Sequence, residues 1–266
     1  MATDLDGTLL AEDGTVSART LAAVCALERA GTTVVLVTAR PPRWVTELAA
    51  ALPCHRLVIC ANGALVYDTA DRRVVRQQTI APAAGAEVLA RLRAVLPDLA
   101  FAAEHAGGFA HEAGYLPRFA TEPSALAASA EELVAVPIAK LLARSPVRLD
   151  DVVLARCREA LVGLGEVSVS GPDGLVEVAA PGVTKAVALE ALCEDLGIAR
   201  FETIAFGDMP NDIPMLAWAG WAVAVANAHP EVKAVADEVT SSCGEDGVAQ
   251  VLERLLAAAG LSAPSW

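Results

Sequence analysis

The chain has 266 residues, of which 55% are hydrophobic and 20% charged, and its formal net charge is −13. A hydrophobic content this high excludes a disordered chain, and the acidic balance argues against nucleic-acid binding, which needs a basic face. The longest apolar run, 213–226, has 14 residues and includes a proline and a glycine, so it falls short of the roughly 20 residues of a membrane-spanning helix. We therefore expect no membrane and no nucleic-acid partner.

The first third of the chain alternates helical patterns with short apolar runs. Ser17 can cap the first helix, and Gly31 can end it. The predicted elements are a helix over 18–30, a strand over 33–37, a helix over 42–52, a strand over 57–60, and a hairpin with strands over 65–67 and 74–78. This strand–helix–strand order implies parallel pairing and therefore predicts a doubly wound, mostly parallel, Rossmann-like α/β sheet.

The middle of the chain mixes strands, helices and frequent turns. After Pro181 the alternation of helices and short apolar strands seen in the first third returns. The predicted middle elements are a helix over 83–95, strands over 99–103, 108–111 and 137–143, a helix over 150–162, and strands over 166–170 and 175–179. After them come a helix over 184–196, a strand over 203–206, a helix over 212–219, a strand over 221–225 and a helix over 246–259. We therefore predict one core from 1–80 and 182–266, with an inserted α+β domain over 81–181.

Two aspartates, Asp4 and Asp6, follow the first predicted strand, in the run Asp4-Leu5-Asp6-Gly7-Thr8. Ligands of open α/β sheets bind beyond the carboxyl ends of the strands. There an aspartate can attack phosphorus, and a second carboxyl can exchange protons with the leaving oxygen and with water. The alternative is a surface turn rich in Asp and Gly.

Two further segments suit an anion. Thr38-Ala39-Arg40 follows the second buried strand, where a hydroxyl and backbone amides can bind phosphate, although a plain helix cap is the better explanation of this segment taken alone. Lys185 falls in the first turn of a predicted helix, where the helix dipole disfavours a cation. A neighbouring anion would compensate for that position, whereas a solvated surface lysine is the alternative.

A second acidic segment, Gly207-Asp208-Met209-Pro210-Asn211-Asp212, follows the strand over 203–206. Two carboxylates and an amide within six residues suit a hard cation such as Mg²⁺, which takes oxygen ligands and keeps several waters. The alternative is a helix N-cap with acidic residues in the first turn. All four segments follow predicted parallel strands or open a helix at one sheet edge, and together they favour a phosphoryl-transfer site.

With these motifs the sequence resembles the haloacid dehalogenase superfamily, and within it the Cof-like phosphatases with a type IIB cap. The resemblance covers nearly the whole chain and includes Asn62-Gly63-Ala64 after the third strand. It implies an α/β core with an inserted cap at 81–181 that selects the substrate, and a Mg²⁺ cofactor. Caps of this kind close over the site and exclude water.

The resemblance also implies a role for each motif residue. Asp4 is the nucleophile and a metal ligand, and Asp6 is the general acid/base and a metal ligand through its backbone carbonyl. Asp208 is the other metal ligand, Asp212 supports the metal indirectly without binding it, and Lys185 offsets the charge of Asp4. The implied phosphate- and substrate-binding residues are Thr8, Thr38, Ala39, Arg40, Asn62 and Asn211.

The resulting expectation is a Mg²⁺-dependent phosphomonoester hydrolase that acts through an aspartyl-phosphate on a small phosphorylated metabolite. We expect a sugar phosphate, although relatives also act on flavin mononucleotide and pyridoxal phosphate. A phosphomutase with the same intermediate is an alternative, and so is a phosphoacceptor signalling module, although such a module needs neither Asp6 nor a cap. Polar cap residues are expected to be ordinary surface residues: Glu104, His105, His111, Arg118 and Lys140.

Two expectations concern the state of the protein. No secretory leader starts the chain and no C-x-x-C pair occurs among the six cysteines. A cytoplasmic protein with reduced, mostly buried thiols is therefore expected. A type IIB cap implies a monomer or a weak dimer.

Overall fold

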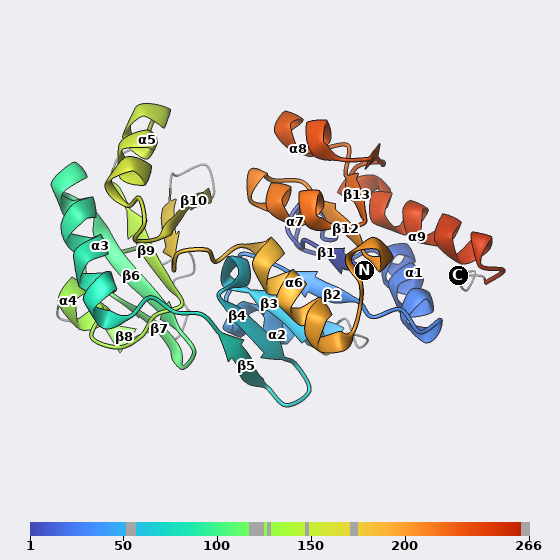
Figure 1. Cartoon of the computed structure of the whole chain (residues 1–266), viewed down its shortest axis with the longest axis horizontal. Coiled ribbons are helices and arrows are strands. Elements are labelled where there is room, and N and C mark those ends of the chain that lie inside the picture. Colours follow the sequence, from blue (N-terminus) through green and yellow to red (C-terminus); the bar gives the residue numbers. More distant parts are fainter. Residues whose placement is uncertain (52–56, 117–124, 127–128, 147–148, 171–174, 262–266) are drawn as a thin grey trace. The chain divides into compact units, whose positions relative to one another are not determined.

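The computed structural model describes residues 1–51, 57–116, 125–126, 129–146, 149–170 and 175–261 (Figure 1). The chain divides into two compact units, which we call the core unit (Met1–Val75 and Thr184–Trp266) and the inserted unit (Arg76–Val183). The assignment of 81–181 as a substrate-selecting cap stays a prediction.

The core unit is built on a mostly parallel sheet. Its elements are β1 (Ala2–Thr3), α1 (Ala18–Arg29), β2 (Val35–Val37), α2 (Pro42–Ala51), β3 (Leu57–Cys60), η1 (Ala61–Gly63), β4 (Leu65–Asp68), β5 (Arg73–Gln77), α6 (Lys185–Leu196), η2 (Arg200–Glu202), β12 (Ile204–Gly207), η3 (Pro210–Asp212), α7 (Ile213–Trp218), β13 (Trp221–Ala224), α8 (Pro230–Val235), β14 (Glu238–Val239), η4 (Cys243–Glu245) and α9 (Gly247–Ala258). The strand order is β14-β13-β12-β1-β2-β3-β4-β5. Pairing is parallel from β14 to β3 and antiparallel between β3 and β4.

The apolar runs of the sequence become the interior of this sheet. All three residues of β2 are buried, as are Ala205 and Phe206 of β12, which is typical of parallel strands covered on both faces. At the start of α1 the Ser17 hydroxyl accepts a hydrogen bond from the Thr20 amide. Helix α1 packs against α9, and α6 packs against α7. These contacts confirm the doubly wound α/β class predicted from the sequence.

The inserted unit pairs helices with a second sheet. Its elements are α3 (Pro82–Val95), β6 (Ala100–His105), β7 (Gly108–His111), β8 (Ala125–Leu126), α4 (Ala130–Leu133), β9 (Lys140–Arg144), α5 (Asp151–Ala160), β10 (Glu166–Ser170) and β11 (Leu175–Ala179). The strand order is β10-β11-β9-β6-β7-β8, antiparallel except between β7 and β8. Helix α3 contacts α4 and α5. This unit has the α+β character expected of it.

Most predicted elements form within a few residues of their expected bounds, and the differences have physical reasons. The strand predicted over 137–143 starts at Lys140 instead, because Pro137 has no amide to donate and Ile138 bridges to Ile80. The elements α4, β8, α8 and β14 were not predicted, because each is too short to show a period. Cys60, Cys157, Cys193 and Cys243 are not disulfide-bonded.

Two further findings concern the expectations about the whole chain. The expectation of reduced thiols is wrong at Cys25, which is disulfide-bonded; a helical pattern shows which face a cysteine occupies but not which second thiol approaches it. Within the described residues, no helix has the length and apolarity needed to cross a bilayer.

Candidate active site

The site begins where two neighbouring strands end. Strands β1 and β12 pair in parallel, with Thr3 opposite Phe206. Asp4 follows β1 directly, and its backbone amide donates to the Phe206 carbonyl at 3.0 Å. Asp208 follows β12 directly. Because parallel strands end at the same edge of a sheet, the two aspartates come from different ends of the chain to adjacent positions.

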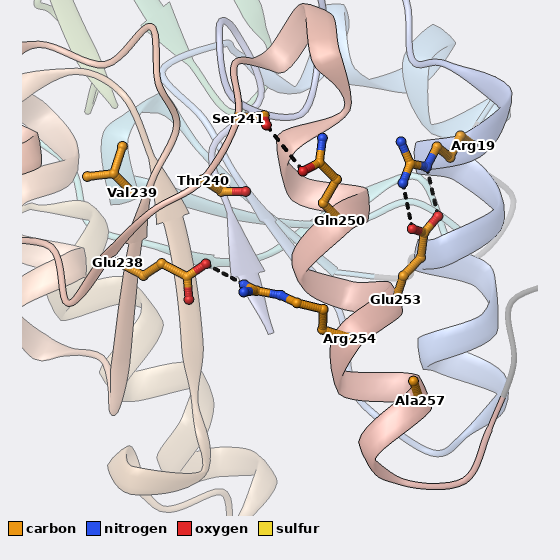
Figure 2. A pocket seen from close by; sticks show the side chains of 9 residues that line it. All are labelled: Arg19, Glu238, Val239, Thr240, Ser241, Gln250, Glu253, Arg254 and Ala257. Carbon is orange, nitrogen blue, oxygen red and sulfur yellow. Dashed lines mark hydrogen bonds and ion pairs between the residues drawn. The ribbon is translucent and has the colours of Figure 1, made fainter.

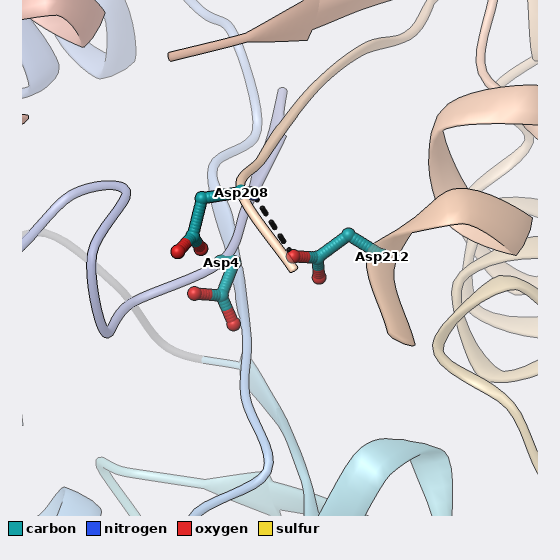
Figure 3. Close-up of side chains that lie close together, drawn as sticks. All are labelled: Asp4, Asp208 and Asp212. Carbon is teal, nitrogen blue, oxygen red and sulfur yellow. Dashed lines mark hydrogen bonds between the residues drawn. The ribbon is translucent and has the colours of Figure 1, made fainter. Parts of the chain in front are cut away.

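Asp4, Asp208 and Asp212 form one buried acidic cluster (Figure 3). One carboxylate oxygen from each lies within 4.8 Å of the others. Asp212 enters from η3, and its Oδ2 accepts hydrogen bonds from the backbone amides of Asp208 (3.1 Å) and Met209 (3.0 Å). The side chain of Asp212 therefore fixes the backbone that presents Asp208.

Lys185 neutralises part of this cluster. Its Nζ donates to Asp4 Oδ1 at 2.5 Å and to Asp212 Oδ1 at 2.6 Å, and the residue is only 1% exposed. Lys185 is the first residue of α6, after the N-cap Thr184, whose hydroxyl accepts from the Val187 amide. The helix dipole opposes a cation at this position, and the two carboxylates supply the compensating attraction.

The mutual influence of these groups appears in their pKa values. Burial and the neighbouring Asp212 and Asp208 raise the pKa of Asp4 well above its ordinary value, although the charge of Lys185 opposes this shift. Burial raises the pKa of Asp208 to about 6 against a hydrogen bond from Thr8. Burial disfavours the Lys185 ammonium, but Asp212 and Asp4 outweigh it and raise the pKa of the lysine. Carboxylates that resist ionisation in this way indicate a site short of positive charge.

The donor set fits a hard divalent cation. Three carboxylates and one ammonium leave two negative charges in excess when all are ionised. Lys185 contacts Oδ1 of Asp4, and Thr8 contacts Oδ1 of Asp208, while within the described residues no hydrogen bond reaches the Oδ2 atom of either aspartate. Carboxylate oxygens are the ligands that Mg²⁺ prefers. Asp212, with both oxygens engaged, suits a supporting position.

The loop Asp6-Gly7-Thr8 packs directly on this cluster. The Thr8 hydroxyl donates to Asp208 Oδ1 at 2.8 Å, and Thr8 is buried. Gly7 has φ +84°, and a Cβ placed on it would lie 2.5 Å from Asp208 Oδ2. The position therefore requires glycine both for its backbone conformation and for space.

Asp6 and Arg40 form a pair of their own. Arg40 Nε donates to Asp6 Oδ2 at 2.8 Å and its Nη2 donates to Asp6 Oδ1 at 2.5 Å, with the Asp6 side chain 56% exposed. The buried Thr38 is linked to this pair, because its hydroxyl accepts from the Arg40 amide at 3.0 Å. Ala39 lies between them in the chain. The structure thus joins Arg40 to the expected acid/base, and substrate binding by Thr38, Ala39 and Arg40 stays a prediction.

Asn62 and Asn211 meet across the site. Asn211 Nδ2 donates to Asn62 Oδ1 at 3.1 Å, and the backbone amide of Asn62 donates to the Thr38 carbonyl at 3.0 Å. Asn62 adopts φ +58°, in the left-handed region that asparagine tolerates. At Gly63, a Cβ would lie 2.3 Å from the Thr184 carbonyl oxygen. The loop after β3 therefore contacts both the acidic loop and the start of α6.

Sequence reasoning missed one turn that touches the site, residues 225–229 after β13. Asn227 Nδ2 donates to the Gly7 carbonyl at 2.7 Å, and the His229 amide donates to the Asp208 carbonyl at 2.8 Å. The signal was available, because Asn227 is a polar residue just beyond a buried parallel strand, as are Asp4, Thr38 and Asp208.

The expectation that the polar residues of the inserted unit lie on the surface is wrong for two of them. Glu104 (4% exposed) and Lys140 (2% exposed) are buried and not on the surface, and they occupy opposed positions on the paired strands β6 and β9. Lys140 Nζ donates to Glu177 Oε2 at 3.0 Å. His105 and His111 are half-buried, and Arg118 lies outside the described residues.

A separate hollow lies beside α9 (Figure 2). Its charged side chains bond to one another, with both oxygens of Glu253 accepting from Arg19 at 2.8 and 2.7 Å, and Arg254 donating to Glu238. Opposite charges already matched within the hollow give an ionic ligand little to bind. The acidic cluster remains the candidate active site.

Comparisons with known proteins agree with this geometry. The model of the haloacid dehalogenase-like hydrolase family matches residues 1–252. The chain is 28% identical over 267 residues to 5-amino-6-(5-phospho-D-ribitylamino)uracil phosphatase YitU of Bacillus subtilis (strain 168), covering 95% of this chain and 96% of YitU. It is 29% identical over 276 residues to HMP-PP phosphatase of Serratia proteamaculans (strain 568), covering 95% and 93% of the two chains.

A solved structure shows the same fold. A haloacid dehalogenase-like hydrolase from B. subtilis superposes with a TM-score of 0.83 at 26% identity, covering 96% of this chain and 99% of that one. The match therefore includes both the core unit and the inserted unit. The chain belongs to the haloacid dehalogenase-like hydrolase family and is an enzyme of its Cof-like group of phosphatases.

Proposed function

We propose that this enzyme is a Mg²⁺-dependent phosphomonoester hydrolase that forms an aspartyl-phosphate on Asp4. The observation that carries the proposal is the buried Asp4 carboxylate. One of its oxygens is held by Lys185 at 2.5 Å, and it sits among two further carboxylates at the end of a parallel strand. An aspartate held in this way keeps one oxygen for attack on phosphorus.

The first half of the reaction transfers the phosphoryl group to the enzyme. As the bond from Asp4 to phosphorus forms, the bond from phosphorus to the leaving oxygen breaks. Asp6, in its protonated form, gives its proton to that oxygen. Lys185 offsets the charge of Asp4, and Thr38 holds phosphoryl oxygens through its hydroxyl. Phosphoryl transfer depends mainly on such positioning and charge neutralisation.

The second half returns the enzyme to its starting state. A water oxygen bonds to phosphorus, the phosphorus–oxygen bond to Asp4 breaks, and the Asp6 carboxylate takes the proton from water. Inorganic phosphate leaves, and both aspartates are ready for another cycle. Asp6 therefore has to serve as acid and then as base, which requires the carboxyl to stay near the reacting oxygen.

Asp4, Asp208 and the Asp6 backbone carbonyl would hold the Mg²⁺, with Asp212 supporting Asp208. When bound, Mg²⁺ supplies the positive charge that lets an anionic phosphate approach two carboxylates. The excess of two negative charges in the cluster supports this assignment. The bound cation would also lower the raised pKa values of Asp4 and Asp208 and so favour their ionised forms.

We further propose a small phosphorylated metabolite of the sugar-phosphate class as the substrate. Support comes from relatives matched over nearly their whole length, one of which is named a phosphatase of a phosphoribityl compound. A ribityl phosphate is a phosphomonoester of a sugar alcohol. At 28% identity this supports the class of substrate and not the individual compound.

Phosphate release from a panel of sugar phosphates, sugar-alcohol phosphates, flavin mononucleotide and pyridoxal phosphate tests the proposal. Each substrate is assayed with Mg²⁺ and with a chelator, for wild type and for Asp4→Asn, which keeps the size of the side chain. We expect metal-dependent release that Asp4→Asn abolishes. Release that persists in Asp4→Asn would contradict an aspartyl-phosphate.

The same panel separates the alternative activities. Isomerised sugar phosphates without phosphate release would indicate a phosphomutase. A long-lived phosphorylated Asp4 without turnover would indicate a phosphoacceptor module.

A further inference from the structure

The turn 225–229 holds together the two loops that carry the acidic cluster. The Asn227 side chain reaches the loop after β1, where its Nδ2 donates to the Gly7 carbonyl at 2.7 Å. Two residues later, the His229 amide donates to the carbonyl of Asp208, after β12, at 2.8 Å. One short turn thus contacts both loops, which come from opposite ends of the chain.

The orientation of the Asn227 amide is determined by its partners. Its Oδ1 accepts from the backbone amide of Cys243 at 2.9 Å. A backbone amide can only donate and a backbone carbonyl can only accept, so the oxygen must face Cys243 and the nitrogen must face Gly7. Both ends of the amide are used, and no other orientation satisfies both partners.

The Gly7 carbonyl belongs to the peptide bond that leads into Thr8. The amide of this same peptide donates to the Leu5 carbonyl at 3.3 Å, and the Thr8 hydroxyl donates to Asp208 Oδ1 at 2.8 Å. Gly7 itself has φ +84° and no room for a Cβ beside Asp208. The Asn227 bond therefore fixes the peptide plane on which the placement of Thr8 against Asp208 depends.

We propose that Asn227 is a positioning residue that sets the geometry of the metal site through the Gly7–Thr8 peptide. The inference rests on the proposed function, because it takes Asp4 and Asp208 as the metal ligands. The hydrogen bonds of the Asn227 side chain join it to Gly7 and Cys243, so it acts on the metal ligands through the loop. Changes in residues that orient metal ligands commonly weaken metal affinity or activity about 10- to 100-fold.

The substitution Asn227→Asp tests this inference sharply. It keeps an acceptor for Cys243 but replaces the donor to Gly7 with an oxygen, which repels the carbonyl. Simple electrostatics predicts the opposite outcome, because an added negative charge near a cation site should tighten metal binding. Positioning predicts weaker binding, so the direction of the change decides between the two.

Gln250→Glu is the matched control. The Gln250 amide also donates to a backbone carbonyl, that of Glu245 at 2.8 Å, and accepts from the Ser241 hydroxyl at 3.1 Å. Gln250 lies on α9 beside the hollow of Figure 2, and these two hydrogen bonds of its side chain go to Glu245 and Ser241, outside the loops that carry the acidic cluster. The same amide-to-acid change is thus made without touching Gly7.

We would measure Mn²⁺ binding without substrate, from the relaxation rate of water protons, because Mn²⁺ uses the same oxygen ligands as Mg²⁺. For Asn227→Asp we expect affinity about 10- to 100-fold weaker, with a parallel loss in kcat and little change in KM. Its metal-free melting temperature should stay within about 4 °C of that of Gln250→Glu. Asn227→Gln, which retains both donor and acceptor, should recover most of the affinity.

Binding by Asn227→Asp that equals or exceeds that of wild type would overturn the inference, as would an equal loss in Gln250→Glu. If Asn227→Asp does not fold, Asn227→Ala replaces it, and unchanged affinity there would also overturn the inference. The proposed function fails by a different result, namely wild type without phosphate release or an active Asp4→Asn. Neither of those results alters the Mn²⁺ titration.

Discussion

The two units each bury a lysine against carboxylates, but in different ways. In the core unit Lys185 bonds to Asp4 and Asp212, and a third carboxylate, Asp208, lies in the same cluster. In the inserted unit Lys140 bonds to Glu177 at 3.0 Å, between strands β9 and β11 of one sheet. The side chains of both lysines are nearly inaccessible, at 1% and 3% exposed.

The difference lies in how the charges are arranged. The Lys185 cluster gathers loops from distant parts of the chain and holds excess negative charge, which is unfavourable in a buried place unless a cation binds. The Lys140–Glu177 pair joins two adjacent strands of the same sheet. We therefore expect the first arrangement to serve binding and catalysis and the second to serve the fold, and mutation of the two lysines should separate these roles.

The largest expected effect is that of Lys185→Met. Removing the ammonium leaves the Asp4 carboxylate, the proposed nucleophile, without this partner and raises its repulsion of a phosphate. We expect kcat to fall by about 10²- to 10³-fold, the range typical for loss of one preorganised electrostatic contact. Steady-state phosphate release with the best substrate measures this. Activity within tenfold of wild type would show that Lys185 only fills space.

Lys140→Met should act on stability instead. It leaves Glu177 buried without this partner, a change that typically lowers the unfolding free energy by about 3–5 kcal/mol. The double variant Lys140→Met/Glu177→Leu removes both charges of this pair, while the buried Glu104 opposite position 140 keeps its carboxyl, and we expect the double variant to recover part of that loss. Urea unfolding measures both variants. Equal losses in the single and double variants would contradict a simple ion pair.

The sequence was sufficient to predict the α/β fold of the core unit because the signals for it lie in residues that are neighbours in the chain. The β-branched run of β2, the Ser17 cap of α1 and the polar residues after β1 and β12 each point to one structure. The Lys185 position was also predictable, since a cation in a first helical turn needs an anion nearby. Such features need no knowledge of distant contacts.

The pairings that sequence reasoning could not provide depend on three-dimensional neighbours. Nothing in the spacing of Asp6 and Arg40 indicates that the two side chains bond. The burial of Glu104 and Lys140 follows from the register of β6 on β9, which the sequence does not specify. Asn227 could have been singled out as a polar residue just beyond the buried strand β13, but its bond to the Gly7 carbonyl could not be foreseen.

The raised pKa of Asp208 should make metal binding by the Lys185 cluster depend on pH. Since burial raises that pKa to about 6, the carboxyl is protonated below this pH and must lose its proton to bind a metal. We expect Mn²⁺ affinity to fall up to about tenfold for each unit of pH below 6. Affinity independent of pH between 5 and 7 would contradict Asp208 as a ligand.

The raised pKa of Asp208 also predicts the direction in which the stability of the metal-free protein changes with pH. The folded pKa of Asp208 exceeds the ordinary value of 3.8, so the folded state binds more protons between these two values. The contribution of Asp208 is therefore fully present below pH 3.8, and the unfolding free energy falls as pH rises through about 6. Saturating metal should remove this loss, and unfolding at pH 5.5 and 7.5, with chelator and with metal, measures it.

The smallest expected effect concerns the exposed pair, Arg40 and Asp6. Both guanidinium contacts to Asp6 are made by one planar fork, which a lysine cannot reproduce. Exposed ion pairs contribute at most about 1 kcal/mol to stability, so Arg40→Lys should leave the melting temperature nearly unchanged. If the guanidinium holds the Asp6 carboxyl in the position that its two proton transfers require, Arg40→Lys should lower kcat about 3- to 10-fold, in line with a loss of about 1 kcal/mol. If Arg40 instead binds the substrate, as the resemblance implies, KM should rise and kcat should change little. Initial rates over a range of substrate concentrations distinguish the two results, and a rise in KM alone would show that the pair seen here opens when the substrate binds.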